Sequence, residues 1–216
     1  MEQIDKFTRL RWLFGDDFEK LQNAKVLVCG CGGVGGACID ALFRSGITQI
    51  TAIDCDKFEI TNQNRQIHSE FVGEYKSDVF SRIYGIQTHN LKLTPDEIDK
   101  FDFCEFSVVI DAIDDIRAKI ALAHACGDKL ISSMGGAKRS DPTQIKIASI
   151  WQTTNDPFAK KIRYELKKSG FYGDFLVVFS TELPKCEKLG SFVGVTASFG
   201  LNLAALAIKK IINKFD

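Results

Sequence analysis

The feature that most constrains the fold of this chain is a glycine-rich turn between a short apolar run and an amphipathic segment. The apolar run is Lys25–Cys29, and the segment from Gly35 to Ser45 carries apolar residues at helical spacing. The turn, residues 30–35, reads GCGGVG. Glycines let the backbone approach a phosphate, and the N-terminus of the following helix supplies N–H donors and partial positive charge. The sequence therefore predicts a strand–turn–helix unit that binds a nucleotide.

Strands and helices alternate along the rest of the chain. Strands are predicted at 25–29, 50–54, 86–93, 107–111, 129–133, 144–150 and 175–180. Helices are predicted at 5–23 (with a break near Gly15), 35–45, 75–85, 115–127, 156–169 and after Ser191. This alternation predicts an α/β, Rossmann-like, doubly wound fold, with a mainly parallel sheet and helices on both faces. We expect one domain over 1–216, in which 1–135 form the nucleotide-binding half and 136–216 extend the sheet.

Composition excludes several classes of protein. The 216 residues are 45% hydrophobic and 26% charged, which rules out disordered and fibrous chains. Lys+Arg and Asp+Glu both number 28, so nucleic-acid binding by overall charge alone is not expected. The charge is uneven, because residues 1–110 carry a net −5 and residues 111–216 a net +5. The basic excess between Lys138 and Lys188 is either a solvated helix face or a docking surface for a polyanion.

Cysteine usage and hydropathy indicate a reduced, cytoplasmic protein. The seven cysteines are odd in number, which fits a reduced protein. No CxxC pair occurs, so we do not expect a structural zinc. The first ten residues include charged side chains, so we do not expect a secretory segment. The most apolar stretch, 192–208, is at the short limit for a membrane span and contains Gly194, Thr196 and Asn202. We therefore expect a helix buried in the core or at a dimer interface, and no membrane partner.

A group of polar residues follows the predicted strand ends. Asp54 ends the second strand, where a carboxylate can hold ribose hydroxyls. Asn62 and Arg65 lie in TNQNRQIH at 61–68, Lys76 follows, and Asp114 comes just after the strand at 107–111. The two cations would neutralise a triphosphate and the aspartate would hold Mg²⁺, whereas NAD needs no such cluster. The other interpretations are surface ion pairs for the cations and a helix N-cap for Asp114.

Together these motifs resemble the ubiquitin-activating-enzyme-like adenylyltransferases, which include the activators of molybdopterin and thiamine synthesis. The motifs are GCGGVG, IDCD at 53–56, TNQNRQ at 61–66, the lysine at 76 and DAIDD at 111–115. Within that superfamily the chain is similar to the tRNA threonylcarbamoyladenosine dehydratase branch. The similarity lies in NRQIH at 64–68, VIDAID at 109–114, GGAKRSDPTQI at 135–145, DPFAKKIRYELK at 156–167 and VFSTE at 178–182, and covers nearly the whole chain.

The resemblance implies roles for individual residues. Asp54 would hold the ribose of ATP, and Asp114 would bind Mg²⁺. Asn62, Arg65 and Lys76 would contact the triphosphate. Arg9 would serve as a second arginine that reaches a neighbouring subunit. The residues implied to cradle the ATP phosphates are Gly30, Gly32, Gly33 and Gly35, and those implied to act in catalysis are Arg65, Asp114, Lys76 and Arg9.

The implied activity is that of an ATP-dependent adenylating ligase or cyclase acting on tRNA. A carboxylate of threonylcarbamoyladenosine, beside the anticodon, attacks ATP and releases pyrophosphate. A nitrogen of the same substituent then closes a ring and releases AMP, so the net change is loss of water. Residues 136–216 would bind the substrate and form a homodimer, and residues 169–191 are a candidate substrate loop. A sulfur-transfer protein is a candidate partner, and Cys186 lies where this branch often has a cysteine, although adenylation needs no thiol.

Three other functions remain open at this level. An adenylyltransferase that activates the C-terminus of a ubiquitin-like sulfur carrier would be expected to have zinc cysteines and an exposed transfer cysteine. A non-catalytic partner protein would bind ATP without turning it over. An NAD-dependent oxidoreductase would need a His or Tyr near the nicotinamide, and His68 is the nearby candidate.

Overall fold

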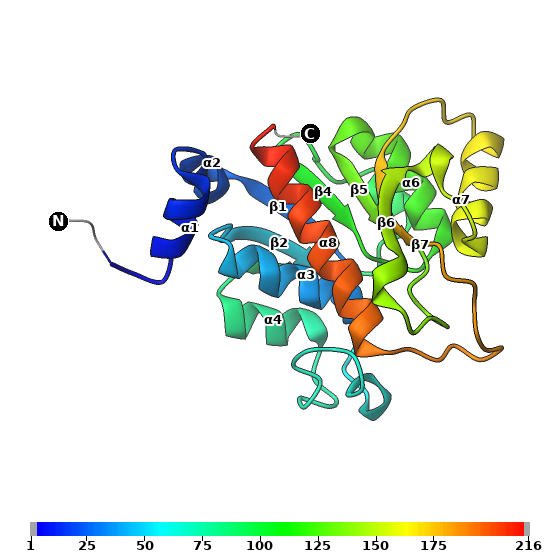
Figure 1. Cartoon of the computed structure of the whole chain (residues 1–216), viewed down its shortest axis with the longest axis horizontal. Coiled ribbons are helices and arrows are strands. Elements are labelled where there is room, and N and C mark those ends of the chain that lie inside the picture. The colour runs from blue at the N-terminus through cyan, green and yellow to red at the C-terminus, as the bar shows by residue number, and fades with distance from the viewer. Residues whose placement is uncertain (1–3, 214–216) are drawn as a thin grey trace.

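The computed structural model describes residues 4–213, which fold around one sheet (Figure 1). Its strand order is β3-β2-β1-β4-β5-β7-β6. All neighbouring strands are parallel except β6, which runs antiparallel to β7 at one edge. The predicted mainly parallel sheet and its extension beyond residue 135 are confirmed. The strands are β1 Lys25–Cys29, β2 Gln49–Ile53, β3 Gln87–His89, β4 Val108–Asp111, β5 Leu130–Ser133, β6 Ile145–Ser149 and β7 Leu176–Ser180.

The helices follow the predicted order with one addition. The predicted segment 5–23 forms two helices separated at Gly15, which has a φ of 55°. The addition is α5, a four-residue helix too short to leave a periodic pattern. The α-helices are α1 Thr8–Phe14, α2 Asp17–Asn23, α3 Gly33–Arg44, α4 Lys76–Tyr84, α5 Pro95–Ile98, α6 Ile116–Cys126, α7 Pro157–Lys168 and α8 Val193–Ile211. Short 3₁₀ turns are η1 Ile60–Asn62, η2 Gly127–Lys129, η3 Pro142–Gln144 and η4 Ile150–Gln152.

The sheet is buried on both faces, as a doubly wound fold requires. Along β1, Val26 and Val28 belong to one hydrophobic core, whereas Leu27 and Cys29 belong to the other. The first core includes side chains of α3, α4 and α8, and the second includes side chains of α5, α6 and α7. Side chains alternate between the two faces of a strand, so a strand buried on both faces is a continuous apolar run. This explains why β1 and β4 were predictable from the sequence.

The apolar stretch near the C-terminus forms α8, which crosses one face of the sheet beside α3 (Figure 1). Phe199 and Leu203 of this helix are fully buried, which confirms the prediction of a core helix. Within residues 4–213, no helix has both the length and the apolar character needed to cross a bilayer. Gly200 lies against α3 so closely that an added Cβ would be 2.8 Å from the backbone nitrogen of Cys38 and would overlap the carbonyl oxygen of Val34.

A Gly200→Val substitution tests this close packing. We expect a loss of stability of about 2–3 kcal/mol, because the atoms that the new side chain meets are backbone atoms that cannot move aside. The melting temperature should fall by roughly 5–10 °C in a chain of this size. Ala205→Val on the exposed side of the same helix is the control, with an expected loss below about 1 kcal/mol. Equal melting temperatures for the two variants would show that the contact with α3 does not constrain residue 200.

Candidate active site

A cavity of about 1120 Å³ opens at the carboxyl ends of the central strands. Its wall includes Gly30 after β1, Asp54 after β2, Ala112 after β4 and Met134 after β5. The strand order reverses between β1 and β4, because the chain runs from β1 to β2 on one side and returns to β4 on the other. Ligands of open α/β sheets bind at this switch point. The cavity is therefore where the sequence motifs predicted a nucleotide site.

The glycine turn forms one wall of the cavity. Gly30 has a φ of 97°, and a Cβ there would lie 2.9 Å from the carbonyl oxygen of Ala112. Gly32 and Gly33 line the cavity at the N-terminus of α3, where no side chain of the described residues caps the helix. Free N–H groups and the helix dipole favour an anion at such a position. Three of the four glycines predicted to cradle a phosphate thus line the cavity, and their contact with a phosphate stays a prediction.

Gly35 has a different role from the one predicted. It is not part of the cavity wall, and a Cβ at this position would overlap the carbonyl group of Gly30. A side chain at residue 35 would push the first turn of α3 away from the loop that follows β1. The residue therefore permits close packing of the turn against the loop that follows β1.

Asp54 joins the end of β2 to the glycine turn. One carboxylate oxygen accepts a hydrogen bond of 2.6 Å from the backbone N–H of Cys31, and the other accepts one of 2.7 Å from Asp56. Burial raises the pKa of Asp54, and the nearby Lys76 ammonium acts in the opposite direction. A carboxylate has about four lone-pair positions, so these two bonds leave acceptor capacity for ribose hydroxyls.

Lys76 is a buried cation with an exposed partner. It begins α4 and is 5% exposed, and its Nζ lies 3.2 Å from a carboxylate oxygen of Asp56. Asp56 is 66% exposed at its side chain, so the ion pair lies at the cavity rim. Lys76 is thus held inside the wall, contrary to the alternative that placed it in a surface ion pair. A further anion beside Asp56 and Asp54, such as a phosphate, would offset the cost of burying this charge.

The segment that carries Asn62 and Arg65 covers the N-terminus of α3. Asn62 Oδ1 accepts a hydrogen bond of 3.1 Å from the N–H of Glu59, which fixes the η1 turn. Arg65 Nη1 donates to the carbonyl of Thr61 at 2.8 Å, and both Asn62 and Arg65 line the cavity. The carbonyl oxygen of Arg65 would be 3.1 Å from a Cβ on Gly33, so the segment packs directly against the helix start.

Of the adjacent residues Asp114 and Asp115, one faces the cavity and the other caps a helix. Asp115 is the N-cap of α6 and accepts a hydrogen bond of 2.9 Å from the N–H of Ala118. Asp114 is exposed and lines the cavity. The N-cap interpretation considered for Asp114 therefore applies to its neighbour. Asp114 is left facing the same space as the glycine turn.

A buried ion pair holds the turn that presents Asp114. Asp111 and Lys119 are 1% and 2% exposed at their side chains, and the charged atoms are 2.8 Å apart. The second Asp111 oxygen accepts the N–H of Ile113, while Lys119 also donates to Ser132 Oγ and the carbonyl of Ser133. Every donor of the ammonium thus has a partner. The sequence did not reveal this network, because a lysine on α6 reads as one more solvated helix residue.

Arg9, like Gly35, is a predicted site residue that does not line the described cavity. It is exposed on α1, which lies at the opposite end of the sheet from α7 (Figure 1). It is absent from the described cavity wall. A contribution of Arg9 to a neighbouring subunit stays a prediction.

The second half of the chain supplies the far wall of the cavity, including residues 133–139 and 156–158. Arg139 is 4% exposed, with its Nε donating to the carbonyl of Glu182 at 2.9 Å and Nη2 lying 3.4 Å from Asp156 Oδ2. The other Asp156 oxygen caps α7 by accepting the N–H groups of Phe158 and Ala159. The sequence places Asp156 at the start of the predicted helix 156–169 but does not reveal its link to Arg139.

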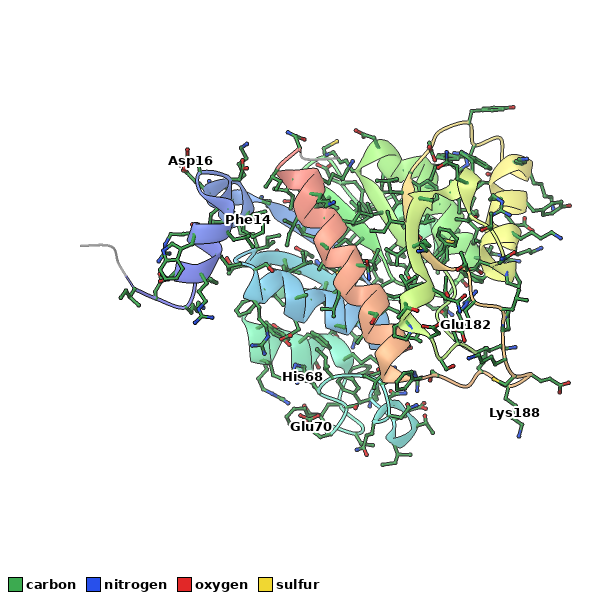
Figure 2. All side chains as sticks on the ribbon, viewed as in Figure 1. Phe14, Asp16, His68, Glu70, Glu182 and Lys188 are labelled. Carbon is green, nitrogen blue, oxygen red and sulfur yellow. The ribbon has the colours of Figure 1, made fainter. Side chains whose placement is uncertain are left out.

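The Lys138–Arg139 pair begins the basic region that the sequence left open as either a solvated face or a docking surface for a polyanion. Arg139 is buried, however, and Lys138 Nζ donates to the carbonyl of Glu187 at 2.7 Å. Figure 2 shows Glu182 on the inner side of the segment between β7 and α8, whereas Lys188 projects from its outer tip. The pair holds this segment against the sheet.

A glycine cradle, an uncapped helix start and two cations around one cavity define a nucleotide-binding domain of Rossmann-like architecture. The model of the ThiF family matches residues 7–215, and the chain belongs to this family. It is 39% identical to tRNA threonylcarbamoyladenosine dehydratase of Bacillus subtilis over 84% of this chain and 76% of the relative. It is 34% identical to the Escherichia coli protein of the same name, over 94% and 91% respectively.

Solved structures agree with these sequence relatives. The crystal structure of the Escherichia coli dehydratase in complex with AMP superposes with a TM-score of 0.91 at 33% identity, covering 96% of this chain and 94% of the other. The structure of the same protein in complex with ATP gives a TM-score of 0.90 at 34% identity, with the same coverage. The predicted family and fold are confirmed.

A Lys119→Met substitution tests the buried ion pair. We expect a loss of stability of about 3–5 kcal/mol, because the Asp111 carboxylate would stay buried without its counter-charge. Arg44→Met is the control, since its ion pair with Asp40 is exposed and should contribute less than about 1 kcal/mol. Urea denaturation measures both. Equal losses in the two variants would contradict a structural role for the pair.

Proposed function

We propose that this chain is an ATP-dependent enzyme that dehydrates N6-threonylcarbamoyladenosine next to the tRNA anticodon, through adenylation of its carboxylate. The observation that carries the proposal is that the glycine cradle, Arg65, Lys76 and Asp114 all line one cavity. The names of the relatives supply the substrate, and the AMP- and ATP-bound structures of the Escherichia coli protein support adenylation. Activation of a sulfur-carrier protein is not favoured by relatives that match along most of the chain.

The size of the cavity agrees with a reaction between two ligands. Pockets for one small molecule usually measure about 300–1,000 Å³. The cavity here is larger, at about 1120 Å³, and has walls from both halves of the chain. The glycine turn and Asp54 occupy one side, whereas Gly135, Phe158 and Leu189 occupy the other. ATP on the first side would leave room for the modified nucleoside on the second.

In the first step, the substrate carboxylate attacks the α-phosphorus of ATP and pyrophosphate leaves. Both reactants are anions, so the protein must place positive charge where they meet. Arg65 and Lys76 supply fixed charge, and the N-terminus of α3 supplies N–H donors toward the phosphates. Asp54 orients the ribose. Positioning converts an encounter between two repelling anions into a reaction inside one cavity.

Asp114 is the residue that we propose to hold Mg²⁺. Among residues 4–213, no group of three or more His, Cys, Asp or Glu side chains is placed as a metal cage. Magnesium at nucleotide sites takes one or two carboxylates together with phosphate oxygens, so an exposed aspartate at the cavity fits this ion. When bound, the ion offsets the charge that develops on the phosphates.

In the second step, a nitrogen of the threonylcarbamoyl group attacks the activated carbonyl carbon. A ring forms, and the bond to AMP breaks. The net change is the loss of one water from the nucleoside, with ATP converted to AMP and pyrophosphate. Water would compete by hydrolysing the activated carboxyl group, so its exclusion matters. Met134, Phe158 and Leu189 give the substrate side of the cavity an apolar lining that disfavours water.

Three further features belong to this proposal. The chain acts as a homodimer, supported by exposed apolar side chains on α8 and β6 that include Leu201, Val193 and Ile147. Arg9 reaches the cavity of the second copy. A sulfur-transfer protein stays a candidate partner; Cys186 is exposed, with its thiol 3.2 Å from the carbonyl of Lys188, and adenylation assigns it no step. Cytoplasmic location stays a prediction.

Neighbouring aspartates give a matched test of the metal role. We expect Asp114→Ala to abolish AMP formation while the melting temperature stays the same, because this carboxylate faces the cavity. Asp115→Ala should lose about 1 kcal/mol of stability through the missing N-cap but retain AMP formation. AMP release and thermal unfolding are measured on both. If Asp114→Ala still released AMP, or if only Asp115→Ala lost AMP release, the metal-binding role would have been assigned to the wrong residue.

The reaction itself is tested with ATP, Mg²⁺ and tRNA that carries threonylcarbamoyladenosine. We expect that nucleoside to lose the mass of one water, with one AMP formed per product, when the digested RNA is analysed by mass spectrometry. Arg65→Ala should prevent both changes, because the charge on the triphosphate is no longer neutralised. Pyrophosphate exchange without any mass change in the nucleoside would contradict the assigned substrate.

A further inference from the structure

The outer face of α7 presents lysines and aromatic rings in a line that begins at the cavity. Pro157 and Lys161 line the cavity, and exposed positions recur along the helix at a spacing of three or four residues. Tyr172 stands in the loop that follows and is 96% exposed. This set is called the α7 stripe and consists of Pro157, Lys160, Lys161, Tyr164, Lys167, Lys168 and Tyr172. Figure 2 shows side chains with nitrogen tips extending outward from this helix.

The α7 stripe is not used to hold the fold together. Ala159, Ile162 and Leu166, on the opposite side of the helix, are buried in the core. Tyr164 is 61% exposed, although it is one of the largest side chains of the helix. Arg163 lies on the same helix but is excluded from the stripe, because its guanidinium donates to the carbonyl of Thr153 at 3.0 Å. The exposed residues therefore form a surface that no other element within residues 4–213 covers.

The stripe carries a local positive charge. Lys161 makes an ion pair of 2.7 Å with Glu165. Between residues 4 and 213, no ion pair includes Lys160, Lys167 or Lys168. The four lysines thus exceed the acidic residues of the same face, and a polyanion is the complementary partner. This charge lies next to the proposed substrate pocket rather than at a random place on the surface.

Aromatic rings among the lysines narrow the class of polyanion. Lys161 Nζ lies 5.3 Å from the ring centre of Tyr164, and Lys167 Nζ lies 5.9 Å from that of Trp151. Proteins bind single-stranded nucleic acid by combining cations for the phosphates with flat rings on which bases stack. A duplex hides its bases from such rings, whereas an RNA loop exposes them. The surface therefore fits unpaired RNA better than a duplex or a simple anion.

We propose that the α7 stripe binds the anticodon loop of the tRNA, with a base next to the modified adenosine stacked on Tyr164 and the flanking phosphates on the lysines. The proposal rests on the proposed function, because a modified base must leave the loop to enter the cavity. Lys161 lies both in the cavity wall and on the stripe, so the nucleotides beside an inserted base pass over the helix. The stripe is thus the continuation of the substrate site outside the cavity.

The first test measures the binding of an unmodified RNA hairpin, with the sequence of an anticodon arm, to the full chain without ATP. Fluorescence anisotropy of the labelled hairpin gives the affinity. Tyr164→Leu keeps an apolar side chain but removes the ring, so affinity should fall about tenfold. Tyr164→Phe keeps the ring and should bind within about twofold of the unaltered protein. Equal affinity of the Leu and Phe variants overturns the assignment of stacking to Tyr164.

The second test concerns the lysines. Lys168→Glu should weaken hairpin binding and reduce the slope of log affinity against log salt by about one. Lys20→Glu is the matched control, because Lys20 is also exposed and lies on α2 at the other end of the molecule (Figure 1). This control should bind the hairpin as the unaltered protein does. Equal binding by the two charge variants overturns the α7 stripe as the RNA surface.

A fully paired RNA of the same length distinguishes loop recognition from general attraction to phosphate. We expect Tyr164→Leu to bind that duplex as the unaltered protein does, because no base is free to stack. An equal loss for duplex and hairpin overturns the proposal. The dehydration assay on modified tRNA decides the proposed function separately, since the hairpin experiments contain neither ATP nor the modified nucleoside.

Discussion

The whole site depends on the close approach of two backbone segments after β1, namely the glycine turn and the first turn of α3. Gly30 turns with a positive φ beneath Ala112, and Gly35 brings the first turn of α3 against the carbonyl of Gly30. A Cβ at either position would separate the helix from the strand end. Asp54 then ties this turn to β2 through the N–H of Cys31. As a result, an uncapped helix start faces the same space as the polar residues from β2 and β4.

Two buried lysines near this space, Lys76 and Lys119, differ in how fully their positive charge is offset by partners. Lys119 has a buried carboxylate, a hydroxyl and a carbonyl as partners, so its three donors are all used. Lys76 is also buried, but its ion pair is with the exposed Asp56, and Asp54 is a second nearby carboxylate. Burial of a charge is costly unless partners offset that cost. Lys119 is therefore complete without a ligand, whereas Lys76 has donor capacity left for the phosphate that we propose it contacts.

The sequence predicted what depends on local pattern. Apolar runs bounded by glycine or aspartate revealed β1 and β4, and Asp156 before Pro157 revealed the start of α7. It could not reveal partners brought together by the fold. Arg139 looked like a surface cation, yet residues distant in the chain, Glu182 and Asp156, enclose it. The roles of Asp114 and Asp115 were likewise indistinguishable in sequence, because which of two adjacent carboxylates caps α6 depends on the backbone angles of the turn.

A net charge of zero is compatible with a tRNA substrate when the basic residues lie beside the reaction cavity. Electrostatic attraction from exposed charges is screened beyond roughly 8 Å at physiological salt. A neutral chain therefore attracts RNA weakly from a distance, and the α7 stripe acts only once the loop is near. Phosphate contacts carry no sequence information, whereas a cavity that accepts one modified base does. In the proposed complex, affinity and selectivity are thus supplied by adjacent surfaces, with Lys161 at the boundary between them.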